Sequence, residues 1–392
     1  MAIVAKSPGA GAGVVTSAPV PSGCREVANI LGIPIDLLTI GQVVEQIDTS
    51  VRTRRRLFIS TVNLNFLALC RTSPAFGYAL RASDICTADG VAVVALCRFL
   101  GVRTPERVAG SDFISALAKR LPSHPHISLF FFGGTDEAGP GAVAAVNSLA
   151  LPNLSAVGHF NPGFGSVDDL SSAAYLDRIN TNHADFLVVS LGAEKGQSWI
   201  VRNLDRIEAP VVSHLGATIN FLAGTVQRAP RAVQRIGLEW LWRIYQEPGL
   251  YRRYVKDTLA LASLVLTRAI PLKIWLWRAG LRSGARGLSV IRAIDAMGAP
   301  QLKLTGALTR DQTMKFEAEF VVAAASGSAV TLDLEELEWL DPYGAGSLLV
   351  MVEEARRLGV SVRASKCSNF VQTGLALYGL DGLSGKAPAK SL

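Results

Sequence analysis

The sequence predicts an α/β protein with a mostly parallel sheet covered by helices on both faces, a basic helical appendage and a small second α/β domain. Three observations support this fold class. Over residues 25–227, short apolar runs alternate with segments of helical periodicity, which is typical of a parallel, Rossmann-like sheet. Basic residues concentrate after residue 227. From residue 286, a β-α-β-α-β-α pattern predicts a separate unit.

The elements of the first unit follow from this alternation. We predict strands and helices at these ranges: strands at 57–62, 127–134, 185–192 and 209–216, and helices at 111–120, 137–150, 170–182 and 197–206. Several of the strands end in glycine, which lets the backbone approach a ligand closely. Because open α/β sheets bind ligands beyond the carboxyl ends of their strands, a site is expected at this edge.

One acid lies at such an edge, in the stretch ICTADGVAVV at 85–94, between a strand-like run and a helix-like run. Asp89 fits two roles. As a helix cap, its side chain would accept hydrogen bonds from free amides of the following helix. As a catalytic base, it would lie where α/β sheets hold their ligands. The local sequence by itself leaves both roles open.

The composition limits the class of protein. Of the 392 residues, 49% are hydrophobic and 18% charged, and the mean hydropathy is +0.30, so the chain is not disordered. No run of about 18 uninterrupted apolar residues predicts a clean membrane span. The five cysteines are scattered without a Cys-x-x-Cys pair, and no His-Glu-x-x-His occurs. These patterns favour a reducing cytoplasm and argue against a disulfide framework or a zinc site.

The positive charge is concentrated in one segment, residues 228–285, of a chain whose net charge is +7. Aromatic and aliphatic residues alternate with arginines there, and residues 258–282 are apolar but interrupted by Arg268, Pro271 and Lys273. A basic, tryptophan-bearing amphipathic helix is typical of an anionic membrane surface. We therefore predict a peripheral membrane appendage; the alternative is a helical hairpin that packs in the core.

The chain is expected to divide into five parts. These are a flexible tail (1–24), an α/β core (25–227), the basic appendage (228–285), the small α/β domain (286–385) and a short tail (386–392). In the small domain we expect elements at these ranges: strands at 301–308, 328–337 and 360–365, and helices at 311–325, 344–359 and 367–380.

Seven ordered blocks within residues 27–255 carry a family resemblance. They are TVNLNFL (61–67), TADGVAVV (87–94), ERVAGSD (106–112), LFFFGG (129–134), LGAEKGQSWI (191–200), GATINFLAGTVQRAP (216–230) and GLEWLWRIYQEP (237–248). In these blocks the core resembles the WecG/TagA/CpsF glycosyltransferases. The resemblance implies a UDP-sugar-dependent hexosyltransferase that acts on a polyprenyl-diphosphate-linked sugar at the cytoplasmic face of the bacterial inner membrane.

The resemblance also implies roles for particular residues. Asp89 matches the family's proposed catalytic base, which would remove the proton of an acceptor hydroxyl. Thr61 and Asn63 match positions that line the same pocket; the alternative is that they are turn residues at a strand end. Arg107 resembles the pocket arginine of the family, and its alternative is a solvated surface charge.

The departing UDP requires stabilisation of its negative charge. No Asp-x-Asp metal motif occurs before residue 255, so a route without metal or cofactor is expected. Backbone amides around Gly133 and Gly134 are candidates for this role. Arg243 and Arg253 match family arginines thought to close over the site, and an arginine fork binds two phosphate oxygens at once. Their alternative is contact with lipid headgroups alone.

Some positions depart from the family pattern, and they concern the donor pocket. Where members commonly read Pro-Lys-Gln-Glu, this chain has EKGQ at 194–197. Gly196 therefore replaces the pocket glutamine, with Lys195 and Gln197 as neighbouring candidates for substrate binding. The other departures are Asn220 for a uracil-facing Asp, Phe164 for a tyrosine that stacks on the substrate, and Leu250 for an arginine.

The last domain resembles a STAS domain through VTLDLEELEWLDPYGAGSLLVMVEEARRLG (330–359). In switchable members two serines follow the Asp, whereas here Pro342 and Tyr343 follow Asp341. A phosphoserine switch is therefore not expected, and docking of a protein partner is the prediction. The alternative is a domain that only stabilises the chain.

Two functions remain after this reading. The first is an inverting glycosyltransferase of exopolysaccharide or cell-envelope glycan assembly, with Asp89 as general base. The second is a catalytically weak or inactive membrane-bound adaptor that acts through its STAS-like domain, which Gly196 and Asn220 would favour. Nucleic acid is not an expected partner, because only the net charge supports it and no nucleic-acid-binding module occurs.

Overall fold

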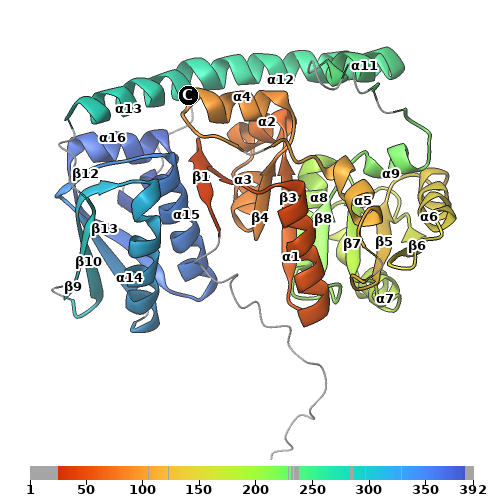
Figure 1. Ribbon diagram of the computed structural model, residues 1–392, viewed down its shortest axis with the longest axis horizontal. Coiled ribbons are helices and arrows are strands. Elements are labelled where there is room, and N and C mark those ends of the chain that lie inside the picture. Colours follow the sequence, from red (N-terminus) through yellow and green to blue (C-terminus); the bar gives the residue numbers. More distant parts are fainter. Residues whose placement is uncertain are drawn as a thin grey trace, which may run out of the picture.

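The computed structural model describes residues 25–384, except 105, 122, 228, 231–232, 234–237, 283–286, 296 and 328. The tails predicted at 1–24 and 386–392 lie outside the described residues, as do Arg228, Arg231, Arg235 and Arg286 of the basic segment. Figure 1 shows two α/β units side by side, with one long helix lying across both. The predicted fold class is confirmed.

The first unit is built on a six-stranded parallel sheet in the order β4-β3-β8-β7-β5-β6. Its strands are β3 (Leu57–Val62), β4 (Ile85–Ala88), β5 (Ile127–Gly133), β6 (Leu154–Phe160), β7 (Phe186–Ser190) and β8 (Val211–His214). They alternate with α1 (Ile40–Thr53), α2 (Leu64–Thr72), α3 (Pro74–Arg81), α4 (Val91–Phe99), α5 (Gly110–Ala118), α6 (Ala138–Ser148), α7 (Ala173–Asn180), α8 (Ala193–Asn203) and α9 (Thr218–Leu222). A 3-10 turn, η1 (Asp169–Ser171), precedes α7.

Both faces of this sheet are buried because apolar side chains point to opposite faces in turn. In β5, Phe131 joins the hydrophobic cluster on one face, while Phe130 and Phe132 join the cluster on the other. Helices α1, α5 and α6 contribute to the first cluster, and α7 and α8 contribute to the second. A parallel sheet covered on both sides leaves its strand ends as the open edge for a site.

A β-hairpin that the sequence pattern did not reveal precedes this unit. Strands β1 (Val27–Ile30) and β2 (Ile33–Asp36) pair antiparallel, and Leu31 and Gly32 at the turn have positive φ. Figure 1 shows β1 between the two α/β units. Every residue of both strands is buried, because the hairpin is covered from both sides.

The basic appendage is helical. It comprises α11 (Glu239–Gln246), a 3-10 turn η2 (Pro248–Leu250), α12 (Tyr251–Leu264), a π-helical turn η3 (Val265–Ala269) and α13 (Ile270–Arg282). By length and composition alone, the stretch Pro248–Leu281 is the one helix among the described residues apolar enough to cross a membrane. One side of it is packed against protein, with Leu264, Leu272 and Trp275 buried, so part of the core-packing alternative holds.

The opposite side of the appendage presents apolar side chains to solvent. They recur at helical spacing at Val255, Leu259, Leu266, Ile274, Trp277 and Leu281. A soluble core helix would bury such a stripe, so this exposed side needs another partner. The predicted amphipathic character is therefore present, with the apolar stripe facing away from both units.

The second unit has a five-stranded sheet in the order β12-β10-β11-β13, with β9 antiparallel to β10. Its strands are β9 (Ser289–Ile294), β10 (Pro300–Leu308), β11 (Ala329–Leu334), β12 (Leu337–Leu340) and β13 (Ser361–Cys367). Its helices are α14 (Thr313–Ala325), α15 (Pro342–Arg357) and α16 (Asn369–Leu377), with 3-10 turns η4 (Arg310–Gln312) and η5 (Asp381–Ser384). The sequence pattern predicted β10, β11, β13 and the three helices, but not β9 or β12.

The two units and the appendage share one hydrophobic cluster. It includes Ile30 and Phe66 of the first unit, Trp275 of the appendage, and Leu302 and Leu348 of the second unit. Cores of independent domains are separate, so a continuous cluster indicates that these parts pack as one body.

Candidate active site

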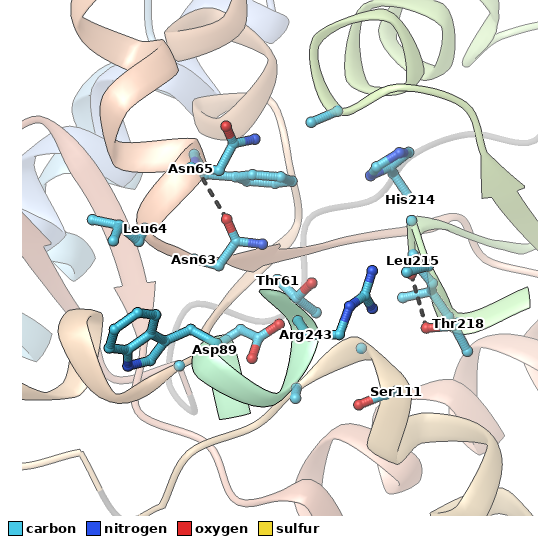
Figure 2. A pocket seen from close by; sticks show the side chains of 18 of the residues that line it. Thr61, Asn63, Leu64, Asn65, Asp89, Ser111, His214, Leu215, Thr218 and Arg243 are labelled. Atoms are coloured by element: carbon cyan, nitrogen blue, oxygen red, sulfur yellow. Dashed lines mark hydrogen bonds between the residues drawn. The ribbon is translucent and has the colours of Figure 1, made fainter. Parts of the chain in front are cut away.

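A cavity of about 870 Å³ opens at the carboxyl edge of the six-stranded sheet. Residues at the ends of β3, β4, β5, β7 and β8 form its floor, and α11 and α12 of the appendage contribute its other wall. Figure 2 shows Thr61, Asn63, Asp89 and Arg243 converging on this space. A cavity of this size is of the order that holds a cofactor or a nucleotide-sized ligand.

Asp89 lies directly after β4, in the loop that leads into α4. Its backbone amide donates to the Val62 carbonyl at 2.8 Å, which ties the loop to the neighbouring strand. The N-cap of α4 is Gly90, with φ of 92° and no side-chain cap hydrogen bond. Asp89 therefore does not cap α4; its carboxylate lines the cavity and accepts from the Gly110 amide at the start of α5.

Burial raises the pKa of the Asp89 carboxyl from 3.8 to about 7, because a charged carboxylate loses hydration there. Arg107 and the Gly110 amide oppose the shift, whereas the nearby acids Asp112 and Glu239 add to it. A carboxyl group with a pKa near neutral is suited to accept a proton from a substrate and release it again.

Arg107 is placed in the middle of these acids. Its guanidinium lies 3.7 Å from Asp89, 3.5 Å from Asp112 and 3.7 Å from Glu239. The alternative of a solvated surface charge is therefore wrong. Arg107 links Asp89 on the core to Glu239 on the appendage, so it joins the two walls of the cavity electrostatically.

Thr61 and Asn63 line the cavity as predicted, and Asn63 has a second role. Thr61 is the fifth residue of β3 and is almost fully buried. Asn63 is the N-cap of α2, where its Oδ1 accepts from the Phe66 amide at 3.1 Å. The turn-residue alternative thus holds for Asn63 together with the pocket role.

Arg243 and Arg253 reach the cavity from the appendage, on α11 and α12 respectively. The Arg243 guanidinium lies 3.3 Å from Glu247 and 5.1 Å from the Phe221 ring centre. Its Nε is buried without a hydrogen-bond partner among the described residues. A buried, unsatisfied donor is costly, so a ligand oxygen at this position would be stabilised.

The paired glycines after β5 hold a turn at the same edge. Gly133 and Gly134 have φ of 98° and 82°, which favours glycine. A side chain at Gly133 would meet the Ser190 carbonyl at 2.6 Å. The Gly134 amide already donates to that carbonyl at 3.0 Å, so it is not available to a phosphate. Gly134 lines the cavity and Gly133 does not, which corrects their predicted role as amide donors.

Three further predicted residues lie outside the cavity. Phe164 is fully exposed on a loop. The Lys195 ammonium donates to the Gly165 carbonyl at 2.6 Å. Gln197 is buried inside α8 and bonds to the Ser60 hydroxyl. Lys195 and Gln197 belong to a recognised block next to the site, but their positions on α8 direct these side chains elsewhere, and Phe164 lies outside the recognised blocks.

The comparisons with known proteins agree with this geometry. The sequence pattern of the WecG/TagA/CpsF family of glycosyl transferases matches residues 28–274. The chain belongs to the WecG/TagA/CpsF glycosyltransferase family. A second pattern, for Mlab-type STAS domains, matches residues 293–385, so the small unit is a STAS domain.

Two similar relatives come from Staphylococcus aureus, and both carry the name N-acetylglucosaminyldiphosphoundecaprenol N-acetyl-beta-D-mannosaminyltransferase. The protein of strain MRSA252 is 28% identical over 217 residues, which is 55% of this chain and 83% of the relative. That of strain NCTC 8325 is 27% identical over the same span and coverage. Membership in this family makes the chain a glycosyltransferase.

The structure explains why Gly196 stands where the sequence departs from the WecG/TagA/CpsF pattern. A side chain at this position would meet the His214 ring at 2.2 Å. His214 is the last residue of β8; it is buried and lines the cavity. Its Nε2 lies 2.6 Å from the Leu191 carbonyl. Burial lowers the pKa of His214, which keeps the ring neutral. The imidazole thus fills the volume that a pocket glutamine would need. Asn220 lines the same wall, on α9.

Sequence reasoning missed several residues of the site. Glu239, Trp240 and Asp257 line the cavity from the appendage, and Ser190 lines it from β7 with its hydroxyl buried and unpartnered among the described residues. Glu239 and Trp240 lie within a block that was recognised, so the signal was present without a chemical reason to select them. Among the described residues, no group of three or more His, Cys, Asp or Glu is arranged to hold a metal ion.

Proposed function

We propose that this chain is a membrane-associated, inverting glycosyltransferase that moves a sugar from a UDP-sugar to a polyprenyl-diphosphate-linked saccharide. The pathway would be exopolysaccharide or cell-envelope glycan assembly at the cytoplasmic face of the bacterial inner membrane. The relatives' names describe an acceptor of this kind. The observation that carries the proposal is Asp89, a carboxylate of raised pKa in a cavity at the strand ends.

In the proposed reaction, Asp89 takes the proton of the acceptor hydroxyl. The hydroxyl oxygen then bonds to the anomeric carbon while the bond from that carbon to the UDP oxygen breaks, and UDP leaves with the electron pair. Arg243 and Arg253 would stabilise the charge of the departing diphosphate, because arginine binds phosphate oxygens strongly. We propose that this step needs no metal or other cofactor.

The appendage supports membrane association in this proposal. Its long helix is docked on α2 and, further along, on α16, and the Arg71 guanidinium donates to the Ala260 carbonyl at 3.0 Å. A helix that crossed a bilayer would have to leave both partners. Lying on the surface, it presents its apolar stripe to lipid and its basic residues to anionic headgroups.

The deciding experiment incubates detergent-purified protein with a panel of UDP-sugars and a polyprenyl-diphosphate-linked acceptor. We expect transfer from at least one donor. Asp89→Asn should reduce the rate by about two orders of magnitude or more, the usual scale for loss of a general base. A wild-type protein that is inert with every donor would reject the proposal and favour the adaptor role.

A further inference from the structure

The face of the STAS domain that carries helix α15 packs against the catalytic unit. Helix α15 packs directly on β1, and a side chain at Gly346 would meet the Val27 carbonyl at 2.4 Å. Ion pairs join the same surfaces, with Arg81 3.0 Å from Glu353 and Arg357 3.0 Å from Asp84. The STAS domain is thus fastened to the catalytic unit through backbone-close packing.

The same domain also contacts the far end of the appendage, at Trp275 of α13. The Trp275 indole donates to the Phe370 carbonyl at 2.9 Å and stacks on the Phe370 ring at 5.0 Å. Its edge faces Tyr378, with ring centres 6.3 Å apart. A side chain at Gly374 would meet the indole at 2.3 Å, so glycine provides the room for this contact. Only 5% of Trp275 is exposed.

The near end of the appendage forms one wall of the cavity. Glu239 lies 3.7 Å from Arg107, and Arg243 and Arg253 line the cavity. From Tyr251 to Arg282 the backbone is helical without a break, through α12, η3 and α13. Figure 1 shows this helix running from the STAS domain to the catalytic unit. Because hydrogen bonds along a continuous helix fix its geometry, holding α13 restricts the position of Arg253 on α12; α11, with Glu239 and Arg243, is joined to this helix through the η2 turn.

We propose that the STAS domain is an internal scaffold that holds the appendage over the catalytic cavity, with Trp275 as a positioning residue. An appendage held in place loses little conformational freedom when substrate binds, so its arginines bind phosphate more tightly than on a free helix. This role differs from docking of a separate protein partner. It rests on the proposed function only for the identity of the reaction.

The test compares four full-length variants by hydrogen exchange and by binding of UDP alone. Trp275→Ala removes both the indole hydrogen bond and the ring stacking, and Trp275→Phe keeps a ring without the hydrogen bond. Gly374→Ala adds one carbon against the indole, and Gly280→Ala is its matched control, because nothing lies within 4 Å of a side chain there. Exchange is followed at 239–264 for the appendage and at 329–334 for the STAS core.

We expect faster exchange at 239–264 and at least about fivefold weaker UDP binding for Trp275→Ala and Gly374→Ala, the lower end of couplings between distant sites. Trp275→Phe should be intermediate and Gly280→Ala like wild type. If exchange at 329–334 is also faster in Trp275→Ala, this variant has destabilised the STAS core itself. The result for Gly374→Ala then decides whether the scaffold holds the appendage.

Normal exchange at 239–264 and normal UDP binding in Gly374→Ala, with the indole displaced, would overturn the scaffold. If the wild-type protein binds no UDP, but exchange at 239–264 is still faster in Trp275→Ala and Gly374→Ala than in wild type, the proposed function is rejected and the scaffold is kept.

Discussion

At the scale of single residues, the proposed chemistry depends on the burial of Asp89 and on three charges around it. Burial raises the pKa of this carboxyl most, Arg107 lowers it, and Asp112 and Glu239 raise it further. The balance leaves the pKa at about 7, so the carboxylate is the conjugate base of a moderately weak acid. Such a base takes up a proton more readily than an ordinary, fully hydrated aspartate.

The pH dependence of the proposed transfer follows from this balance. The deprotonated form is the base, so kcat/KM should rise from pH 6 to 8 with an apparent pKa near 7. Arg107→Gln removes a charge that lowers the pKa, so it should shift the rise to higher pH. Glu239→Gln removes a charge that raises it and should shift the rise to lower pH. Rate profiles of the three proteins measure both shifts.

The two variants serve as controls for each other, because any general damage to the site would lower both rates without moving the profiles apart. Profiles that move in the same direction would contradict the assignment of the titration to Asp89.

The contact between Gly196 and His214 is a second feature at this scale. A glutamine side chain at position 196 and the imidazole at 214 cannot occupy the same volume, because the first side-chain carbon would lie 2.2 Å from the ring. The departure from the family pattern at Gly196 is thus sterically matched to His214, and it does not by itself indicate loss of activity.

This contact predicts the effect of restoring the family residue. Gly196→Gln should lower the free energy of unfolding by about 1–3 kcal/mol, the usual cost of overpacking. Adding His214→Gly should recover most of that loss. Gly192→Gln, on the same helix terminus with open space around it, should have little effect on stability. Urea unfolding measures all four proteins; a stable Gly196→Gln single variant would contradict the steric explanation.

At the scale of elements, the long helix of the appendage has two different apolar sides. The side with Leu264, Leu272 and Trp275 is buried against protein, and the side with Leu259, Leu266 and Trp277 is exposed. A helix that only bridges two domains requires one apolar side. The second side is explained if it inserts among lipid headgroups, where tryptophan is favoured.

This second side predicts the response to vesicles that contain anionic lipid. Replacing Leu259, Leu266 and Trp277 together by asparagine should lower retention at least about tenfold, since each side chain contributes on the order of 1 kcal/mol or more when buried in an apolar phase. The control replaces Leu149 and Leu358, which are exposed elsewhere, by asparagine. Flotation measures retention, and equal retention of both variants would refute a membrane role for the stripe.

At the scale of the whole molecule, the β1–β2 hairpin occupies a central place. The Asn29 amide donates to the Tyr378 carbonyl of the STAS domain at 3.2 Å, and Arg25 pairs with Asp36 at 2.5 Å beside the catalytic sheet. The Cys86 amide, in β4, donates to the same Asp36 carboxylate at 2.6 Å. The hairpin therefore connects the six-stranded sheet to the helices of the STAS domain, and the shared hydrophobic cluster continues through it.

Much of this architecture could be predicted from the sequence. Strand β3 spans the expected 57–62, and β5 and α6 differ from expectation by a few residues, because their periodic patterns are long and strong. The short strands β1, β2 and β12 have four residues each and no distinctive period, so local pattern did not reveal them. They exist because neighbouring elements cover them.

The site was predictable to a similar degree. Thr61, Asn63, Asp89 and Arg107 lie together because each follows or ends a parallel strand of one sheet, and the sheet brings such positions to one edge. Lys195 and Gln197 also follow a parallel strand, β7, yet their side chains make contacts outside the cavity, and Phe164 is exposed on a loop after β6. Direction depends on the exact turn and helix phase, which residue spacing alone does not specify.

The sequence by itself determined the fold class, the family and the position of an acid at a strand end, since periodicity and ordered motifs are local properties of the chain. Only the tertiary structure decided that Asp89 does not cap α4, that Glu239 reaches Arg107, and that the STAS domain holds Trp275. These contacts join residues far apart in the chain, so they depend on how finished elements pack and leave no mark in local pattern.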